Sequence, residues 1–185
     1  MSSTYTLPTS NLNPKELPHN IEAEQGLLGA ILLNNEIFYD VSEVINIDHF
    51  YEAVHKTIFE VIHKLISKGQ IATPITLKSY FEVEKTLEEI GGSSYLARLA
   101  NSAVSLDYAK SYAQIIYDLA VRRGLFELGG KVQHDAIESE MDIKPSDLIE
   151  EAEKDSYQIS EKGISTHNVQ TVSYTHLRAH ETDRY

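Results

Sequence analysis

Residues 107–136, DYAKSYAQIIYDLAVRRGLFELGGKVQHDA, contain the pattern that decides the fold. Apolar side chains recur every three or four residues along the whole stretch, which predicts one continuous amphipathic α-helix. The positions that share this pattern are Ala109, Tyr112, Ile116, Leu119, Leu125 or Phe126, Val132 and Ala136. A helix of some thirty residues at 1.5 Å per residue is roughly 45 Å long, more than a compact domain of this size needs internally.

Three glycines interrupt the second half of this helix, at Gly124, Gly129 and Gly130. Each glycine costs about 1 kcal/mol in a helix interior. We therefore expect a kink or an unusually close packing contact in this region.

A second helix follows the polar break ESEMDIKPS at residues 138–146. Ser146 is expected to cap this helix, which ends near Gly163. Its apolar positions are Leu148, Ile149, Ala152, Tyr157 and Ile159. Two helices joined by a short polar turn form an antiparallel hairpin, which we assign to residues 107–162.

A hairpin this small cannot bury both of its apolar sides alone, so we expect it to pack against another subunit. Burial of one Leu or Ile contributes roughly 1.5–3 kcal/mol, so a few such residues suffice for a micromolar dimer once association entropy is deducted. The residues predicted at this oligomer interface are Tyr112, Ile116, Leu119, Phe126, Leu148, Ala152 and Ile159.

The residues before the hairpin predict a helical head of about five short helices at 17–106, behind a flexible leader at 1–16. Asn20 suits the N-cap of the first helix, and the periodic stretch 46–69 predicts the strongest helix of the head. Pro74 disfavours helix at the residue before it, so the next helix is expected to begin at a Thr76 cap. A Gly91-Gly92 turn should precede a further short helix. No strand pattern competes, and the predicted fold class is all-α.

Composition limits the possible partners and compartment. The 185 residues carry 16 Lys plus Arg against 28 Asp plus Glu, a net charge of −12, which argues against direct binding of duplex DNA or an anionic membrane. The chain has no cysteine, which suits a reducing compartment and excludes disulfides and thiolate metal sites. Neither a signal peptide nor an apolar run of about 20 residues is evident, so a cytoplasmic location is expected.

No motif in the chain argues convincingly for catalysis. The segment Gly124–Val132, GLFELGGKV, approaches a phosphate-binding loop, but its second glycine is out of register with Lys131 and a valine replaces the required hydroxyl. We therefore expect no catalytic residue, no metal, no cofactor and no ATPase activity in this chain. His55 and His63 lie eight residues apart without a third ligand at matching spacing, and we interpret both as ordinary helix residues.

The end of the chain contains a second arrangement that could suggest a metal. His176 and His180 lie four residues apart with Glu181 beside them, which is the spacing of several zinc hydrolases. A catalytic zinc needs three protein ligands, and no third ligand follows, so a metalloenzyme is not expected.

Several segments together resemble the opening of replicative DNA helicases of the DnaB family. The resemblance runs in order and with natural spacing from about Leu17 to Ser160. It is carried by LPHNIEAEQGLLGAILLNNE at 17–36, DHFYEAVHKTIFEVI at 48–62, ITLKSYFE at 75–82, LEEIGGSSYLARLA at 87–100 and YAQIIYDLAVRRGL at 112–125.

This resemblance implies an N-terminal domain whose hairpins pair into dimers, three of which build a collar over a hexameric motor ring. It implies primase and a helicase loader as partners, and DNA through the parent assembly. The family's RecA-like ATPase domain, which would use ATP and Mg²⁺ for 5'–3' unwinding, does not follow in this sequence. The expected role is therefore oligomerisation and partner docking in DNA replication by a helicase truncated before its motor, with linker starting at 163–171.

The alternative is a free-standing helical adaptor or regulator that has the same fold. Residues 172–182, VSYTHLRAHET, bear on this choice because they resemble a one-frame translation of a transposase adapter used in sequencing libraries. That resemblance implies a non-native tail at 172–185, which favours truncation and leaves the terminal histidines without a role.

Overall fold

The computed structural model describes residues 17–83, 88, 91–139 and 143–161. Within these ranges the chain forms helices and no strands, which confirms the all-α prediction. The elements are α1 (Ile21–Leu33), α2 (Glu36–Val41), the 3-10 turn η1 (Ile47–His49), α3 (Ala53–Ser67), α4 (Pro74–Val83), α5 (Gly92–Asn101), α6 (Leu106–Glu138) and α7 (Pro145–Glu161). The predicted leader, linker start and adapter-like tail, including the terminal histidines, lie outside the described residues.

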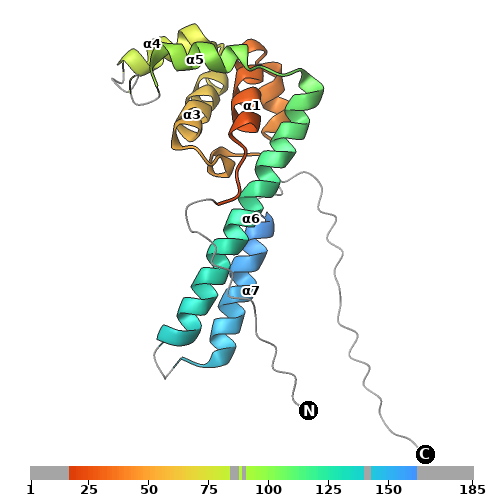
Figure 1. The fold of residues 1–185 in the computed structure, drawn as a ribbon, viewed down its shortest axis with the longest axis vertical. Helices are drawn as coiled ribbons and strands as arrows, with labels where there is room; N and C mark the ends of the chain where they lie inside the picture. The colour runs from red at the N-terminus through yellow and green to blue at the C-terminus, as the bar shows by residue number, and fades with distance from the viewer. Residues whose placement is uncertain (1–16, 84–87, 89–90, 140–142, 162–185) are drawn as a thin grey trace, which may run out of the picture.

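Helix α1 is the centre of the head: α2, α3, α5 and the start of α6 pack against it, and α4 packs against α3 and α5 (Figure 1). Leu27, Leu28 and Ile31 are completely buried, so this helix is apolar around most of its circumference rather than along one stripe. Gly29 lets α1 and α5 meet, because a Cβ at this position would collide with the backbone carbonyl oxygen of Leu99. The close approach of two backbones explains why a glycine stands in the middle of a helix.

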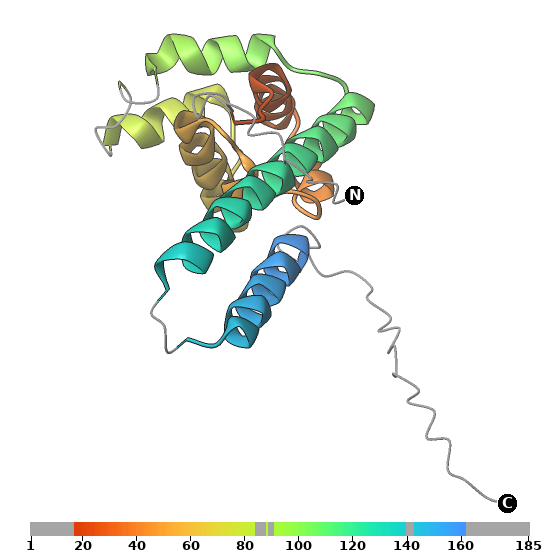
Figure 2. The same ribbon diagram turned by 60° about the horizontal axis from the view of Figure 1, so that its bottom comes forward.

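The long helix α6 belongs to both parts of the molecule. Near its start, Ala109, Ala113 and Ile116 are buried in the core of the head. Farther along, the helix leaves the head and pairs with α7 to form the predicted antiparallel hairpin (Figures 1 and 2). The predicted length is confirmed, since α6 is one uninterrupted helix of 33 residues.

Local sequence signals predicted the start of α1 correctly, and the structure corrects three other predicted helix starts. Asn20 caps α1 as expected, its side-chain oxygen accepting from the Ala23 amide at 2.9 Å. Helix α4 begins at Pro74 rather than after Thr76, because proline fits the first helical position, where its missing N–H is not needed. Helix α7 likewise begins at Pro145, one residue before the predicted Ser146 cap.

The third correction concerns the predicted helix over residues 46–69. Asn46 accepts a hydrogen bond from the Asp48 amide, and its own amide donates to His49 Nδ1, which closes a separate 3-10 turn. The α-helix starts only at Ala53. Two backbone amides before it are bound by a side chain from α1, a partner that local sequence signals cannot reveal.

No helix in the described part of the chain is long and apolar enough to cross a membrane.

Candidate interaction surface

The hairpin is held together by one close packing contact and one pair of ionic contacts. A Cβ built on Gly124 of α6 would lie 3.4 Å from the Ile159 side chain of α7, which confirms close packing at one of the three helix glycines. Two helical turns farther along α6, Lys131 Nζ donates to Glu151 and Asp155 at 2.7 Å each. The hydrogen bonds to Asp155 and Glu151 raise the pKa of Lys131. These contacts lie at the surface, so they fix the register of the two helices more than they add stability.

The segment that resembles a phosphate-binding loop is part of this hairpin. Gly124–Val132 lies wholly within α6, where the backbone amides are committed to helical hydrogen bonds. A phosphate cradle requires such amides to converge on the ligand from a loop. The Lys131 ammonium group is also bound to two carboxylates of α7. In the described structure the segment takes part in the pairing of α6 with α7.

A shallow apolar groove remains between the two helices toward the hairpin tip. Its volume is about 240 Å³. Apolar side chains that line it are Leu128, Val132, Ala136, Leu148, Ile149 and Ala152. The two helices of one hairpin therefore do not fill the space between them completely.

The side of α6 that faces away from α7 carries a row of apolar residues, which we call the outer face of α6. It consists of the exposed residues Ile115, Phe126 and Ile137 and the half-buried Leu119, together with Gly129 and Gly130. Phe126 follows Gly124 by two residues, which turns its side chain about 200° away from α7. Phe126 is 45% exposed and Ile137 is 78% exposed. Such a row on a long helix is unusual for a surface that faces only water.

The two glycines of this outer face make no close packing contact in the described part of the chain. Among the described residues, none has an atom within 4 Å of the place where a Cβ of Gly129 or Gly130 would lie. Neither glycine has the positive φ angle that would require this residue type. Two consecutive helix-weakening residues in open space point to a neighbour that approaches the helix backbone closely.

The structure distributes the seven predicted interface residues over three environments. Tyr112 packs against the head core, and Ile116 is enclosed in it, which removes Ile116 from any surface that a partner could reach. Leu119 and Phe126 lie on the outer face of α6. Leu148, Ala152 and Ile159 are half-buried against α6 inside the hairpin. The dimer interface itself remains a prediction.

Sequence reasoning did not single out Ile115 and Ile137 of the outer face. The spacing 115, 119, 126 and 137 continues the helical repeat, so the signal was present, but it competed with the stripe that faces the head and α7. On the surface of α7, Ile149 and Tyr157 are also strongly exposed.

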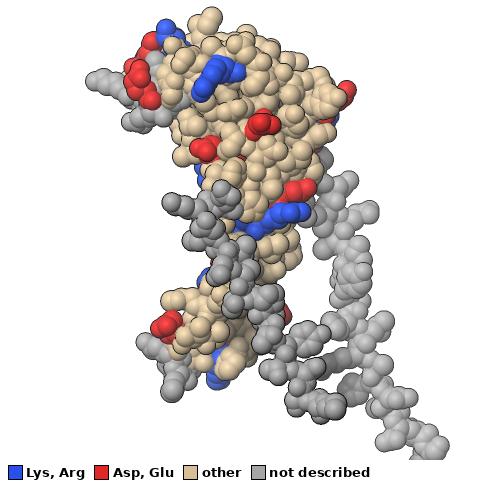
Figure 3. Space-filling view, in the orientation of Figure 1, with Lys and Arg blue, Asp and Glu red and all other residues tan. Residues whose placement is uncertain are grey.

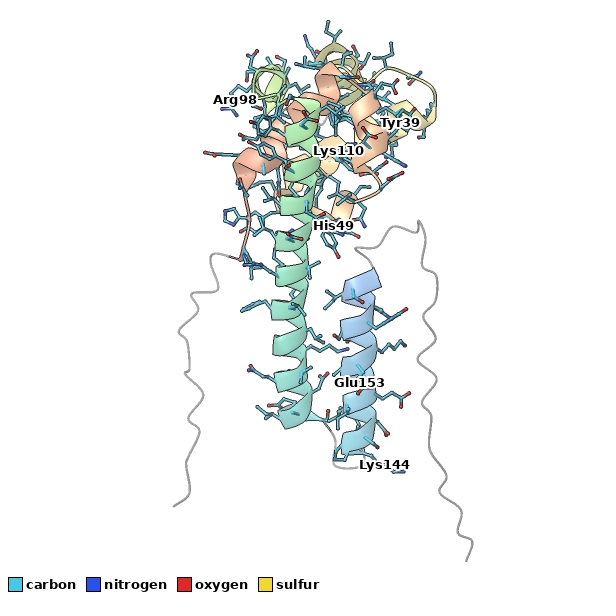
Figure 4. All side chains as sticks on the ribbon, turned by 90° about the vertical axis from the view of Figure 1, so that its right-hand side faces the viewer. Tyr39, His49, Arg98, Lys110, Lys144 and Glu153 are labelled. Atoms are coloured by element: carbon cyan, nitrogen blue, oxygen red, sulfur yellow. The ribbon has the colours of Figure 1, made fainter. Side chains whose placement is uncertain are left out.

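Figure 4 shows Lys144 at the hairpin tip and His49 at the base of the head beside α6.

A guanidinium group joins the hairpin to the head. Arg123 donates to the backbone carbonyls of Pro18, at 2.8 Å, and His49, at 2.6 Å. It also lies over the ring of Tyr51, which is stacked on His19 at 4.2 Å between ring centroids. Desolvation by its surroundings lowers the pKa of Arg123, while Glu24 and Glu127 act in the opposite direction.

A buried polar network holds the head together. The Glu24 carboxylate lies 2.5 Å from Nδ1 of His55, and the Tyr95 hydroxyl lies 2.6 Å from Nε2. The same carboxylate accepts the amides of Tyr51 and Glu52, the contacts that set the start of α3. His55 is thus completely buried and joins three helices, which is more than the ordinary role predicted for it.

The described residues contain no metal-ligand cluster, and the face drawn in Figure 3 has no continuous basic band. No cluster of three or more His, Asp or Glu side chains there could hold a metal ion. On the face drawn in Figure 3, basic and acidic side chains are scattered without a continuous basic band.

Comparison with known proteins agrees with this description. The model of the family described as "DnaB-like helicase N terminal domain" matches residues 16–118, which is more than half of the chain. A replicative DNA helicase DnaB of Rickettsia felis is 41% identical over 152 residues, covering 82% of this chain and 31% of the relative. The replicative DNA helicase DnaC of Bacillus subtilis is 33% identical over 154 residues, covering 83% of this chain and 34% of the relative.

Solved structures show the same architecture. The N-terminal domain of DnaB helicase from Mycobacterium tuberculosis superposes with a TM-score of 0.72 at 26% identity, covering 77% of this chain and 99% of that one. A DnaB-like replicative helicase, described with its interactions with primase, gives a TM-score of 0.60 at 24% identity, covering 76% and 31%. The chain spans about a third of the length of the curated relatives that it matches.

Proposed function

This chain belongs to the DnaB-like helicase N-terminal domain family, and on that premise we propose that it is the self-association and partner-docking domain of a replicative DNA helicase. In this role the head is a rigid body, and the hairpin pairs with the hairpin of a second copy. Dimers of this kind would form a collar in a hexameric ring.

The outer face of α6 is the observation that carries this proposal. An isolated chain leaves Phe126 and Ile137 in water and has two adjacent glycines with no contact in the described structure. A second helix laid along this face would cover the apolar side chains and could approach the backbone at the glycines. One neighbouring helix thus accounts for both the exposed apolar side chains and the two glycines.

The rest of the parent protein would supply the motor. Because the relatives are about three times as long as the matched region, we assign ATP and Mg²⁺ binding, DNA unwinding and DNA contact to the part beyond it. Primase is the proposed docking partner, supported by the related helicase described with its interactions with primase. A helicase loader is a further proposed partner, and the cytoplasm is the compartment in which such an assembly would act.

Sedimentation equilibrium with a pair of matched variants tests self-association. Ile137→Gln alters the outer face of α6, and Ile75→Gln makes the same change on α4 of the head, where the isoleucine is equally exposed at 77% against 78%. The variant dimer loses one buried isoleucine from each copy, worth roughly 1.5–3 kcal/mol apiece, so the dimer should weaken by at least about 100-fold. The head variant should retain the affinity of the unmodified chain. Equal affinities for all three proteins, or no association at all, would refute the proposal.

A further inference from the structure

The place where α6 leaves the head contains a cleft, which we call the junction cleft. Its volume is about 570 Å³. The base of the head forms one wall with Asn46, Asp48 and Lys56, and the last turns of α7 form the other with Gln158 and Ile159. Helix α6 is the floor between them. The end of α7 is therefore separated from the base of the head by open space.

Apolar packing alone secures only the first part of α6. Ile116 is the last fully buried residue of this helix, and none of its later described side chains is fully buried. Arg123 follows Ile116 by two helical turns and lies on the floor of the junction cleft. Its contacts thus act at the point where the core no longer controls the direction of the helix.

Arg123 binds two segments of the head that are far apart in the sequence. The Pro18 carbonyl belongs to the entry into α1, and the His49 carbonyl lies at the end of η1. Both acceptors are backbone atoms, so their positions are fixed by the fold of the head. The planar guanidinium group can hold both at once, a geometry that a lysine ammonium group at the end of a flexible chain does not enforce.

Aromatic packing fixes the guanidinium group from one side. The Arg123 guanidinium carbon lies 5.6 Å from the centre of the Tyr51 ring. Tyr51 in turn stacks on His19 with an angle of 8° between the two rings. Hydrogen bonds and the contact with the Tyr51 ring therefore hold the Arg123 side chain against the head, at the place where α6 leaves it.

We propose that Arg123 is a positioning residue that latches the hairpin to the head, and that release of its two carbonyl contacts lets the hairpin tilt across the junction cleft. The distance from Arg123 to the end of α6 is about 22 Å at 1.5 Å per residue, so a tilt of roughly 10° moves the hairpin tip by about 4 Å. The latch thus sets where the outer face of α6 lies relative to the head. This inference concerns one chain and does not depend on self-association.

Distance measurements between two spin labels test the latch directly. The sequence has no cysteine, so Ser79→Cys on α4 and Glu153→Cys on α7 give two unique labelling sites on exposed residues. Labelled chains diluted with an excess of unlabelled chains report only distances within one molecule. We expect a narrow distribution with Arg123 intact, and a shifted mean or at least a twofold broader distribution for Arg123→Ala.

Arg122→Ala is the matched control, because the neighbouring arginine is exposed and the same charge is removed. It should retain the narrow distribution. An Arg123→Ala distribution equal to that of the intact chain overturns the latch, and so does equal broadening in the Arg122→Ala control. Circular dichroism checks that the helices remain. If Arg123→Ala does not fold, the same measurement is made with Arg123→Lys. A broader distance distribution than that of the intact chain supports the latch, and an unchanged distribution refutes it.

Discussion

His55 of α3 and Glu24 of α1 form a completely buried contact, with 2.5 Å between His55 Nδ1 and Glu24 Oε2. The carboxylate can only accept, so the ring nitrogen that faces it carries a hydrogen. Tyr95 of α5 completes the arrangement from the other side of the ring. One polar cluster therefore fixes the mutual positions of α1, α3 and α5, three of the helices that build the head.

Removal of the imidazole should destabilise the head strongly. His55→Leu leaves the Glu24 carboxylate buried without its partner, and we expect a loss of about 3–5 kcal/mol in the free energy of unfolding. Urea unfolding followed by circular dichroism measures this loss. Tyr95→Phe is the milder companion, since it removes one hydroxyl and should cost about 0.5–1.5 kcal/mol. A His55→Leu effect no larger than that of Tyr95→Phe would contradict the assigned importance of the pair.

The crossing of α1 and α5 predicts an unusual response at Gly29. Helix propensity alone predicts that Gly29→Ala stabilises the protein by about 1 kcal/mol. The added Cβ would instead collide with the Leu99 carbonyl and lie 2.9 Å from the Ala103 amide nitrogen, both backbone atoms that cannot move aside alone. We expect a loss of about 1–3 kcal/mol, as in other overpacked cores, measured by thermal or urea unfolding. A stabilised Gly29→Ala protein would show that the two helices do not meet here.

Lys131 provides a test of whether this chain hydrolyses ATP by itself. Its ammonium group pairs with Glu151 and Asp155 and lies within a continuous helix, so we expect no ATP hydrolysis above background by this chain. Lys131→Met should leave that background unchanged while weakening the contact between α6 and α7. A coupled-enzyme ATPase assay decides the matter. Turnover that is abolished by Lys131→Met would contradict the structural role.

The sequence predicted the parts of the fold that depend on local periodicity. The repeat from Ala109 to Ala136 predicted a helix close to the observed Leu106–Glu138, and Asn20 was correctly identified as a cap. Local signals failed at the start of α3, because the amides before it bind Glu24, 27 residues earlier in the chain. The partners of Arg123 could not be predicted for the same reason, because they are also distant in the sequence. Backbone carbonyls at residues 18 and 49 have no sequence signature at all.

The interaction surface was predictable only in part. Phe126 was predicted at the interface because the hairpin cannot bury both of its apolar sides alone, and the structure leaves it exposed on the outer face of α6. Ile116 belongs to the same repeat, yet it is buried in the head, because one helix serves the core in its first half and the hairpin in its second. A helical repeat states which residues share a face, and the point at which the helix leaves the core is a property of the tertiary structure.

The central claim, self-association through the outer face of α6, is tested most directly by replacing both of its glycines with alanine. Gly129→Ala with Gly130→Ala should raise the free energy of unfolding by about 1–2 kcal/mol at concentrations where the chain is monomeric, because alanine favours the helix. The same change should weaken the dimer at least tenfold in sedimentation equilibrium, because two methyl groups separate the backbones. A more stable monomer with a weaker dimer is the predicted result. A more stable monomer with an unchanged or tighter dimer would contradict the claim.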